Sequence, residues 1–404
     1  MLLLFQNPRF RLLWFSTVFN DAGLITHMMV HGWLALSVTD SPFWVGATAG
    51  TGGLSLMVSS VFGGVVADRV DRRRLVMSAQ VFQAAIALGL ATLIFTDEIR
   101  LWHVLAVAAV QGVVVSAKIP ARYALILDVV GRENVLRAMA AMFASMTIMG
   151  IAAPIAAGTI VSTFDIGWAY VIVAAVYLCG AALLLSLHGV PRVEKEASSP
   201  WEDLVQGLRF AFNSRSLRIL LAVALVGESF GWSHESMLPV MARDVLGVNA
   251  SGLGYLLAGA SAGGLVSTLT LSSLSEIRHK GTLLVVGFGG FGLFLVAFAW
   301  SPWFPLSVLL LAVAYALAVP YETALSTLFQ TSVPNEMRGR ALSFQTFTWG
   351  LSALAGFQTG TVATYLGAPV AIAVGGGVVV LGALRMASYV SPFNEPTTPV
   401  VESG

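Results

Sequence analysis

A short charged stretch, Asp68-Arg69-Val70-Asp71-Arg72-Arg73-Arg74, separates two long apolar runs at residues 43–67 and 75–95. Six of its seven residues are charged, and charged side chains are costly in the hydrocarbon core of a bilayer. Each flanking run is long enough to cross a membrane, which takes about 20 apolar residues. The stretch therefore predicts a tight turn at a membrane surface between two spanning helices.

The composition indicates a membrane protein. Of the 404 residues, 57% are hydrophobic and 11% are charged, whereas a soluble domain carries about 25% charged residues. The net charge of +1 gives no reason to expect nucleic-acid binding, and the single cysteine, Cys179, excludes a disulfide framework. No phosphate-binding Gly-x-x-x-x-Gly-Lys motif occurs, which excludes ATP-driven pumping by this chain alone. We expect no enzyme activity, no cofactor and no metal.

The apolar runs predict an all-α membrane fold of twelve transmembrane helices in two pseudo-symmetric six-helix bundles. A long polar stretch at about 189–216 divides the helices six and six. We predict an N-terminal bundle at 1–189, a cytoplasmic linker at 190–216, a C-terminal bundle at 217–390 and a cytoplasmic tail at 391–404. The spans are predicted at 11–37, 42–67, 75–96, 101–121, 137–162, 166–189, 217–242, 251–274, 281–301, 303–329, 339–363 and 367–389.

The loops alternate in charge. One set of loops, with both termini, holds 20 of the 22 Lys and Arg residues, and the other side has only Arg100 and Arg243. Because cytoplasmic loops carry the excess of Lys and Arg, the sequence predicts a multi-pass protein of the plasma (bacterial inner) membrane with both termini in the cytoplasm.

The two halves are related by sequence. A shift of 207 residues aligns Asp21 with Glu228 and His27 with His234, and Pro120 matches Pro320 at a similar offset. Repeated halves are typical of secondary transporters, whose binding site lies between the repeats near the middle of the membrane.

Three motifs carry a family resemblance. They are Gly64-x-x-x-Asp68-Arg69-x-x-Arg72-Arg73, Pro334-Asn335-Glu336-Met337-Arg338-Gly339-Arg340, and Gly150-x-x-x-Pro154-x-x-x-Gly158 in the fifth predicted helix. Over nearly the whole chain, the sequence resembles the major facilitator superfamily of transporters. Within it, the sequence is similar to the twelve-helix drug/proton antiporters that include macrolide and enterobactin exporters. It departs from their patterns at Asp71, Ala108 and Ala153.

The resemblance implies a transporter that changes conformation and has a latch between its halves at the inner face. The latch residues would be Gly64, Asp68, Arg69, Arg72, Arg73, Glu336, Arg338 and Arg340. The alternative is that these charges only set the topology. The motif Gly150, Pro154 and Gly158 resembles the antiporter motif of exporters, and it implies efflux.

Two acids lie deep in predicted spans. Asp21 and Glu228 each lie about 10–12 residues into a helix, which is near mid-membrane at 1.5 Å per residue. A carboxyl group there can exchange a proton for a substrate. Glu235 and Trp232 share the helical face of Glu228 and predict a surface for cationic or amphipathic molecules. Alternatively, the acids only pack the halves together.

Further candidates surround these acids. Arg122 and Glu322 occupy repeat-related positions with opposite charges and predict an inner gate; otherwise they are ordinary interfacial charges. Mid-helix residues that would line a mixed polar and aromatic cavity, or else pack helices, are Gln111, Met142, Met149, Gln345, Phe347 and Trp349.

The sequence thus predicts a monomeric secondary active transporter that exports a small amphipathic organic compound, of drug or siderophore type, in exchange for protons by alternating access. Its partners would be this substrate, protons and the lipid bilayer. Two alternatives stay open. One is a metabolite uptake symporter or facilitator, and the other is a lipid flippase or non-transporting membrane scaffold with the same fold.

Overall fold

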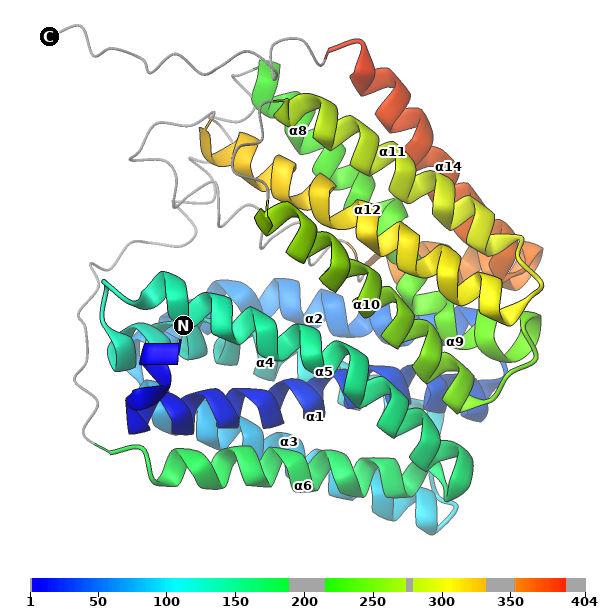
Figure 1. Cartoon of the computed structure of the whole chain (residues 1–404). Coiled ribbons are helices and arrows are strands. Elements are labelled where there is room, and N and C mark those ends of the chain that lie inside the picture. The colour runs from blue at the N-terminus through cyan, green and yellow to red at the C-terminus, as the bar shows by residue number, and fades with distance from the viewer. Residues whose placement is uncertain (1, 189–214, 274–278, 332–351, 353, 390–404) are drawn as a thin grey trace, which may run out of the picture.

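The chain is described by a computed structural model that covers residues 2–188, 215–273, 279–331, 352 and 354–389. These residues are helical apart from short turns and contain no β-strand. Figure 1 shows them in two groups, one holding the helices before residue 189 and the other holding the helices after residue 214.

The N-terminal group begins with a short 3-10 turn, η1 (Leu2–Gln6), and contains six long helices. Local sequence sets their starts. The Asn7 side chain caps the first helix, the Asp71 side chain accepts a hydrogen bond from the Arg74 N–H at the start of the third, and Asp165 caps the sixth. The helices are α1 (Pro8–Thr39), α2 (Pro42–Arg69), α3 (Arg72–Phe95), α4 (Leu101–Val130), α5 (Val135–Thr163) and α6 (Ile166–Leu185).

The C-terminal group starts with an interrupted helix and continues with regular ones. The interrupted helix consists of α8 (Arg215–Val226), η2 (Gly227–Gly231), η3 (Trp232–Met237), α9 (Leu238–Val240) and η4 (Met241–Val245). After it come α10 (Ala250–Ser273), α11 (Lys280–Ala299), α12 (Phe304–Thr331), a helical segment at 354–366 and α14 (Ala368–Ala387).

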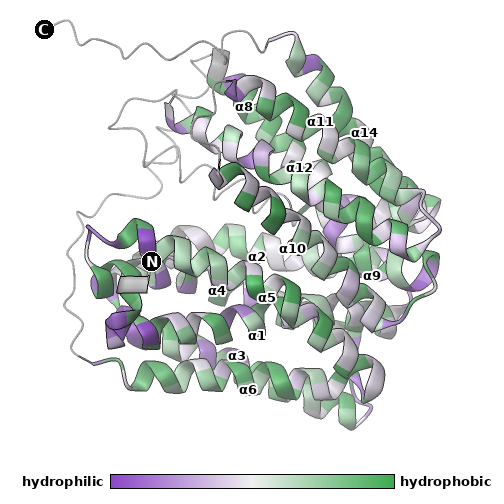
Figure 2. Ribbon diagram, viewed as in Figure 1, coloured by the Kyte–Doolittle hydropathy of each residue, from purple (hydrophilic) through white to green (hydrophobic). Residues whose placement is uncertain are grey.

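The membrane character predicted from composition is confirmed. Eight of the described helices, α3 to α6, α10 to α12 and α14, are long and apolar enough to cross a membrane. The other four predicted positions are taken by α1, α2, the interrupted helix and the segment at 354–366. Hydrophobic residues dominate along the helices, and hydrophilic ones gather near helix ends and turns (Figure 2). The fold is therefore an all-α membrane fold of two six-helix bundles.

Some predicted boundaries differ from the observed ones. The charged stretch is tighter than a loop, because only Val70 and Asp71 separate α2 from α3. Helix α4 continues through Pro120 to Val130, nine residues beyond the predicted end at 121. The domain boundaries stay predictions, since residues 189–214 and 390–404, which hold most of the linker and the tail, lie outside the described residues.

Two seams of small residues join the bundles. Along the first, a Cβ at Gly158 of α5 would overlap the Ala250 carbonyl of α10, and one at Gly254 would overlap the Pro154 carbonyl. Along the second, Gly46 of α2 lies against the Gly356 backbone. Glycine has no side chain, so the helix backbones can approach closely. We call the end of the molecule that holds these seams the closed end.

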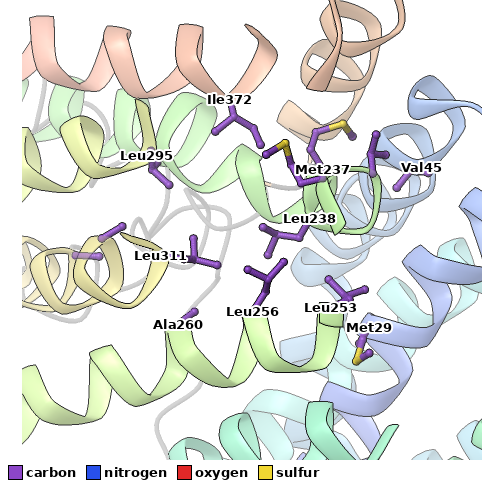
Figure 3. Packing of buried hydrophobic residues seen from close by; sticks show 14 of the residues in the cluster. Met29, Val45, Met237, Leu238, Leu253, Leu256, Ala260, Leu295, Leu311 and Ile372 are labelled. Carbon is purple, nitrogen blue, oxygen red and sulfur yellow. The ribbon is translucent and has the colours of Figure 1, made fainter. Parts of the chain in front are cut away.

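An apolar cluster seals the closed end. Met29 and Val45 of the N-terminal bundle lie beside Met237, Leu238 and Leu253 of the C-terminal bundle, and all five are buried (Figure 3). Their packing excludes water between the bundles at this level.

The bundles part toward the opposite end, where the N-terminus lies (Figure 1). Met146 and Phe143 share the α5 face of Gly150 but are 50% and 60% exposed. On α10, Ser261 is the residue that touches Gly150. Thr268 lies two turns beyond Ser261 and is also exposed. The faces that pack together at the closed end are therefore accessible toward the opposite end.

Candidate functional site

The interrupted helix holds two of the predicted acids. The sequence predicted a spanning helix at 217–242, and the structure shows that this helix is interrupted, because Gly227–Gly231 and Met241–Val245 are π-helical and Trp232–Met237 is a 3-10 turn. Pro239 lacks an N–H and clashes with the preceding turn, which prevents a regular ladder of hydrogen bonds there. Single π-turns inside helices often occur at functional sites.

Three carboxyl groups gather in the C-terminal bundle. Glu228 is 7% exposed, Glu322 of α12 is half-buried and Glu235 is exposed. Glu235 lies one turn before Pro239, which touches Gly32 of α1 at the closed end. The three groups lie within electrostatic reach of one another, although the sequence predicted only Glu228 and Glu235 as neighbours.

The partners of these acids are neutral. The Tyr315 hydroxyl donates to Glu235 Oε1 at 2.6 Å, Ser352 lies within hydrogen-bond reach of Glu228, and Trp232 lies beside Glu322. Among the described residues, none of the three acids forms an ion pair with Lys or Arg. These three acids form an acidic wall of the C-terminal bundle with which no Lys or Arg in the described ranges pairs.

Aromatic rings complete this wall. The Trp232 ring packs edge-on against Tyr315 at 5.3 Å and lies 5.2 Å from Phe291. His234 is 1% exposed, and its Nδ1–H donates to the Gly231 carbonyl. Rings beside carboxyl groups offer both stacking and cation–π contact to an organic molecule.

The acid of the N-terminal bundle is neutralised. Asp21 is 3% exposed, and its Oδ1 lies 2.8 Å from Arg122 Nη1. Asp21 also accepts hydrogen bonds from Ser145 Oγ at 3.1 Å and from Asn20 Nδ2 at 3.2 Å. The repeat places Asp21 and Glu228 at equivalent positions, but Asp21 pairs with a cation, whereas Glu228 pairs with none in the part of the chain that the structure describes.

Arg122 does not contact Glu322 in this structure. The predicted inner gate joins these two side chains across the bundles, but Arg122 pairs within its own bundle with Asp21, and Glu322 lies beside Trp232. The two side chains do not meet because the bundles are apart toward the opposite end in the state described here. The gate stays a prediction for the state in which that end is closed.

Several latch residues hold their own bundle together. Arg72 pairs with Asp128 of α4 at 2.6 Å, and the two side chains are 6% and 4% exposed. Arg73 donates to the Leu184 and Leu185 carbonyls at the end of α6. These contacts fix the start of α3 to the ends of two neighbouring helices, and they satisfy free helix C-terminal carbonyls.

The other latch residues are not engaged, or they lie outside the described part. Arg69 is exposed, and nothing lies within 4 Å of a Cβ built on Gly64, so the predicted close helix approach at Gly64 is not present in this state. Its neighbour Gly63 makes such an approach, to the Ser116 carbonyl. The Asp68 side chain and Glu336, Arg338 and Arg340 lie outside the described part of the structure.

The fifth-helix motif lies on a bundle seam. Gly150 faces Ser261, and Pro154 and Gly158 face Gly254 and Ala250, so all three motif residues contact α10. Among the cavity candidates, Met142 lies in an apolar cluster and Met149 is half-buried. Gln111 is buried and accepts a hydrogen bond from Gln83. Gln345, Phe347 and Trp349 lie outside the described residues.

An ion pair crosses the bundles at the closed end. The Arg243 guanidinium contacts the Asp40 carboxylate of the other bundle and lies 2.6 Å from Asp244 of its own. The hydrogen bond to Asp244, with Asp40 adding to it, raises the pKa of Arg243 above its usual value. Arg243 therefore stays charged and links the bundles.

A buried polar network was not predicted. Lys118 Nζ donates to Asn20 Oδ1 at 2.9 Å and to Gln83 Oε1 at 2.5 Å. Gln83 Nε2 donates in turn to Gln111 at 2.7 Å. A signal was present in the sequence, because Lys and Gln inside apolar runs are rare in membrane helices and mark functional or packed interiors. No group of His, Cys, Asp and Glu in the described ranges is suited to hold a metal ion.

Comparisons with known proteins agree with this fold. Residues 2–398 match the family described as transmembrane secretion effector. The enterobactin exporter EntS of Escherichia coli O81 (strain ED1a) is 26% identical over 305 residues, which cover 75% of this chain and 72% of the relative. EntS of Shigella flexneri is 26% identical over 303 residues, with the same coverage of 75% and 72%.

Solved structures share the architecture. The nucleoside transporter NupG superposes with a TM-score of 0.78 at 13% identity, covering 94% of this chain and 98% of that chain. A bacterial homolog of the human lysosomal transporter Spinster gives 0.73 at 15%, covering 96% and 98%. At such identities the likeness shows the fold alone. These relatives are membrane transporters and not enzymes. The chain belongs to the transmembrane secretion effector family of the major facilitator superfamily, and it is a multi-pass membrane transporter.

Proposed function

We propose that this transporter exports a small amphipathic organic compound, of drug or siderophore type, in exchange for protons. One observation carries the proposal: Glu228, Glu235 and Glu322 gather beside aromatic side chains without an ion pair to Lys or Arg among the described residues. A carboxyl group that is removed from water and has no cation beside it disfavours its charged form, so it binds a proton. It releases the proton when a group that interacts more favourably with the carboxylate binds.

Several features support export from the cytoplasm. The relatives at 26% identity are named enterobactin exporters. Of the 22 Lys and Arg, the loops predicted on the outer side hold only Arg100 and Arg243, and Arg243 lies at the closed end, so the positive-inside rule favours a closed end outside the cell. Both termini would then lie in the cytoplasm of a bacterium, beneath its inner membrane. The state described here would be accessible from the side where an exporter loads its substrate.

Alternating access would use the bundles as two units. We propose that residues 1–189 and 217–390 rock as two units about two seams, one between α5 and α10 and the other between α2 and the segment at 354–366. The linker 190–216 and the tail 391–404 would lie in the cytoplasm. Each chain carries both halves of the site, so a monomer suffices. In the opposite state, the predicted latch and the Arg122–Glu322 gate would close the cytoplasmic end.

Transport into inside-out membrane vesicles tests the proposal. The vesicles come from a bacterial strain that lacks its own siderophore exporters, and the probe is iron-free enterobactin, with a macrolide as a second probe. ATP hydrolysis by the native proton pump acidifies the vesicle interior. We expect accumulation that nigericin abolishes, because nigericin collapses the proton gradient. Glu228→Gln should lose gradient-driven accumulation and keep exchange of labelled for unlabelled probe.

A matched acid serves as the control. Glu98, in the turn between α3 and α4, has a side chain that is 66% exposed, so Glu98→Gln should transport as wild type does. Accumulation in right-side-out vesicles, with none in inside-out vesicles, would instead support uptake. Normal gradient-driven export by Glu228→Gln would refute proton coupling at this acid.

A further inference from the structure

A lysine lies buried in the N-terminal bundle, outside the acidic wall. Lys118 of α4 is 3% exposed. Its Nζ lies 2.9 Å from Asn20 Oδ1 and 2.5 Å from Gln83 Oε1, and 5.4 Å from the centre of the Tyr177 ring. Two amide oxygens and a ring face replace only part of the hydration that an ammonium ion has in water.

No carboxylate contacts this lysine in the part of the chain that the structure describes. Asp21, which lies within electrostatic reach of Lys118, is held by Arg122 at 2.8 Å. Asn20 connects the two groups, because its Oδ1 accepts from Lys118 while its Nδ2 donates to Asp21. With Lys118 protonated, the cluster of Lys118, Arg122 and Asp21 carries two positive charges and one negative charge.

Polar atoms without partners surround the lysine. The Tyr177 hydroxyl and Gln111 Nε2 are buried and have no hydrogen-bond partner among the described residues. Tyr177 is fully buried, and its ring is the one over Lys118. Unsatisfied buried polar groups need an explanation, and ordered water or an exchanging ion is a common one.

The polar path continues toward the closed end. His27 lies within electrostatic reach of Lys118, and its Nδ1 also has no partner in the described ranges. His27 stacks on His31 at 4.9 Å, and His31 contacts the Tyr170 hydroxyl and the Val104 carbonyl. A column of buried polar side chains therefore runs along α1 inside the bundle.

We propose that Lys118 is a second proton-binding site of this transporter, and that the Arg122–Asp21 pair controls its proton. The site presupposes the proton-coupled transport proposed above. Lys118 releases one proton to water and becomes a neutral amine, and it takes the proton back in the reverse step. While Arg122 holds Asp21, release leaves a neutral interior, which avoids an uncompensated buried charge.

Closing the opposite end would instead favour the protonated form of Lys118. If Arg122 moves to Glu322, as the predicted gate requires, Asp21 loses its cation and attracts the Lys118 ammonium through Asn20. The charged and titratable groups that face Lys118 are Asp21 and His27 from α1, Arg122 from its own helix and Tyr177 from α6. Gln83 faces it from α3, and Ser145 of α5 holds Asp21.

The lysines can be observed directly. The chain has three, Lys118, Lys195 and Lys280, so lysine labelled with ¹³C at Cε and ¹⁵N at Nζ gives three signals in protein reconstituted in nanodiscs. Single Lys→Arg variants assign them. We expect the Lys118 signal to change from the charged to the neutral form across the neutral pH range. Lys280, the first residue of α11, gives a second signal for comparison.

Two variants should move the Lys118 signal in opposite directions. Arg122→Gln frees Asp21 for Lys118, so at a fixed pH the ratio of neutral to charged Lys118 should fall about tenfold, which corresponds to one pKa unit. Asp21→Asn leaves both cations without an acid, and the neutral fraction should rise. Ser145→Ala removes a hydroxyl from Asp21 without freeing it from Arg122, so it should leave the Lys118 titration unchanged. The two opposed variants keep the test decisive if one fails to fold.

The outcomes separate this site from the proposed function. A Lys118 that stays charged wherever the protein is folded, or one that ignores both variants, overturns the site even if enterobactin export is gradient-driven. A titrating Lys118 that responds to both variants supports the site. If vesicles then show no gradient-driven export, the proposed function fails while the proton-binding site remains.

Discussion

Arg122 of α4 and Asp21 of α1 form an ion pair at 2.8 Å, with side chains that are 17% and 4% exposed. The repeat-related positions in the other bundle hold Glu322 and Glu228, which form no ion pair among the described residues. One bundle therefore neutralises its intramembrane acid with its own arginine, whereas the acids in the described part of the other bundle have no Lys or Arg partner. The two halves share a fold and differ in electrostatics.

Removing the acid of this pair should destabilise the N-terminal bundle. Asp21→Asn leaves Arg122 buried without its partner, and breaking a buried pair in this way costs about 3–5 kcal/mol. The free energy of unfolding in detergent micelles measures the loss. The double variant Asp21→Asn with Arg122→Gln removes both charges and should recover part of it. A double variant no more stable than Asp21→Asn would contradict this explanation.

The Arg72–Asp128 pair should contribute much more to stability than an exposed pair. Asp128→Asn leaves the 6% exposed Arg72 side chain without its carboxylate, so we expect a loss of about 3–5 kcal/mol in the free energy of unfolding. The comparison is Glu98→Gln, which breaks the 3.9 Å pair with Arg100, whose side chain is 72% exposed. That exposed pair should contribute less than about 1 kcal/mol. Equal losses would show that burial does not set the difference.

Asp40 and Asp244 offer a matched test of the link at the closed end. Arg243 contacts both, but only Asp40 belongs to the other bundle. Asp40→Asn should therefore favour opening of the closed end by about 0.2–1 kcal/mol, the usual range for exposed pairs. Asp244→Asn should not change the opening.

Labelling of an introduced cysteine measures this opening. Ser251 of α10 bonds Ser162 across the bundles, so Ser251→Cys in a chain with Cys179→Ser reports on the closed end with a membrane-impermeant maleimide. Labelling should accelerate up to about fivefold in Asp40→Asn, which corresponds to about 1 kcal/mol. Equal acceleration in Asp244→Asn would mean that the bridge between bundles is not responsible.

Substitutions at two adjacent glycines of α2 distinguish a role in helix packing from a role in the predicted latch. A Cβ at Gly63 would overlap the Ser116 carbonyl, whereas nothing lies within 4 Å of a Cβ at Gly64. Gly63→Val should therefore destabilise the fold by about 1–3 kcal/mol through overpacking. Gly64→Val should change stability by less than about 1 kcal/mol, the size of a helix-propensity effect.

Transport then tests the latch itself. If α2 meets the other bundle at Gly64 when the opposite end closes, Gly64→Val should slow export while its stability stays normal. Gly89 of α3 also has nothing within 4 Å of a Cβ, so Gly89→Val controls for a valine in an open helical position. Normal export by Gly64→Val would remove Gly64 from the latch.

Local features of the sequence were enough for the architecture. The length of the apolar runs predicted the helices, because a bilayer demands about 20 apolar residues and internal hydrogen bonds. The charged stretch at 68–74, which is costly to place in hydrocarbon, predicted the turn between α2 and α3 correctly. The interruption after Val226 could not be predicted in detail, since Pro239 signals a break but not the π-turns on both sides of it.

The candidate site was predicted in part. Mid-membrane acids are visible in a sequence because they are costly in lipid, and so Asp21, Glu228 and Glu235 were found. Their partners were not, because Arg122 lies 101 residues from Asp21 and Tyr315 lies 80 residues from Glu235. Only packed helices decide which distant side chains meet.

The sequence by itself determined that this chain crosses the membrane repeatedly, that it has two related halves and which of its loops are basic. Each of these follows from the cost of moving polar groups into hydrocarbon, which acts residue by residue. The tertiary structure alone decided that Asp21 pairs with Arg122 while Glu228 pairs with no described Lys or Arg, and that the bundles meet through glycine seams at one end. Those outcomes depend on which helix faces pack together, and short-range interactions between surfaces far apart in the chain set that choice.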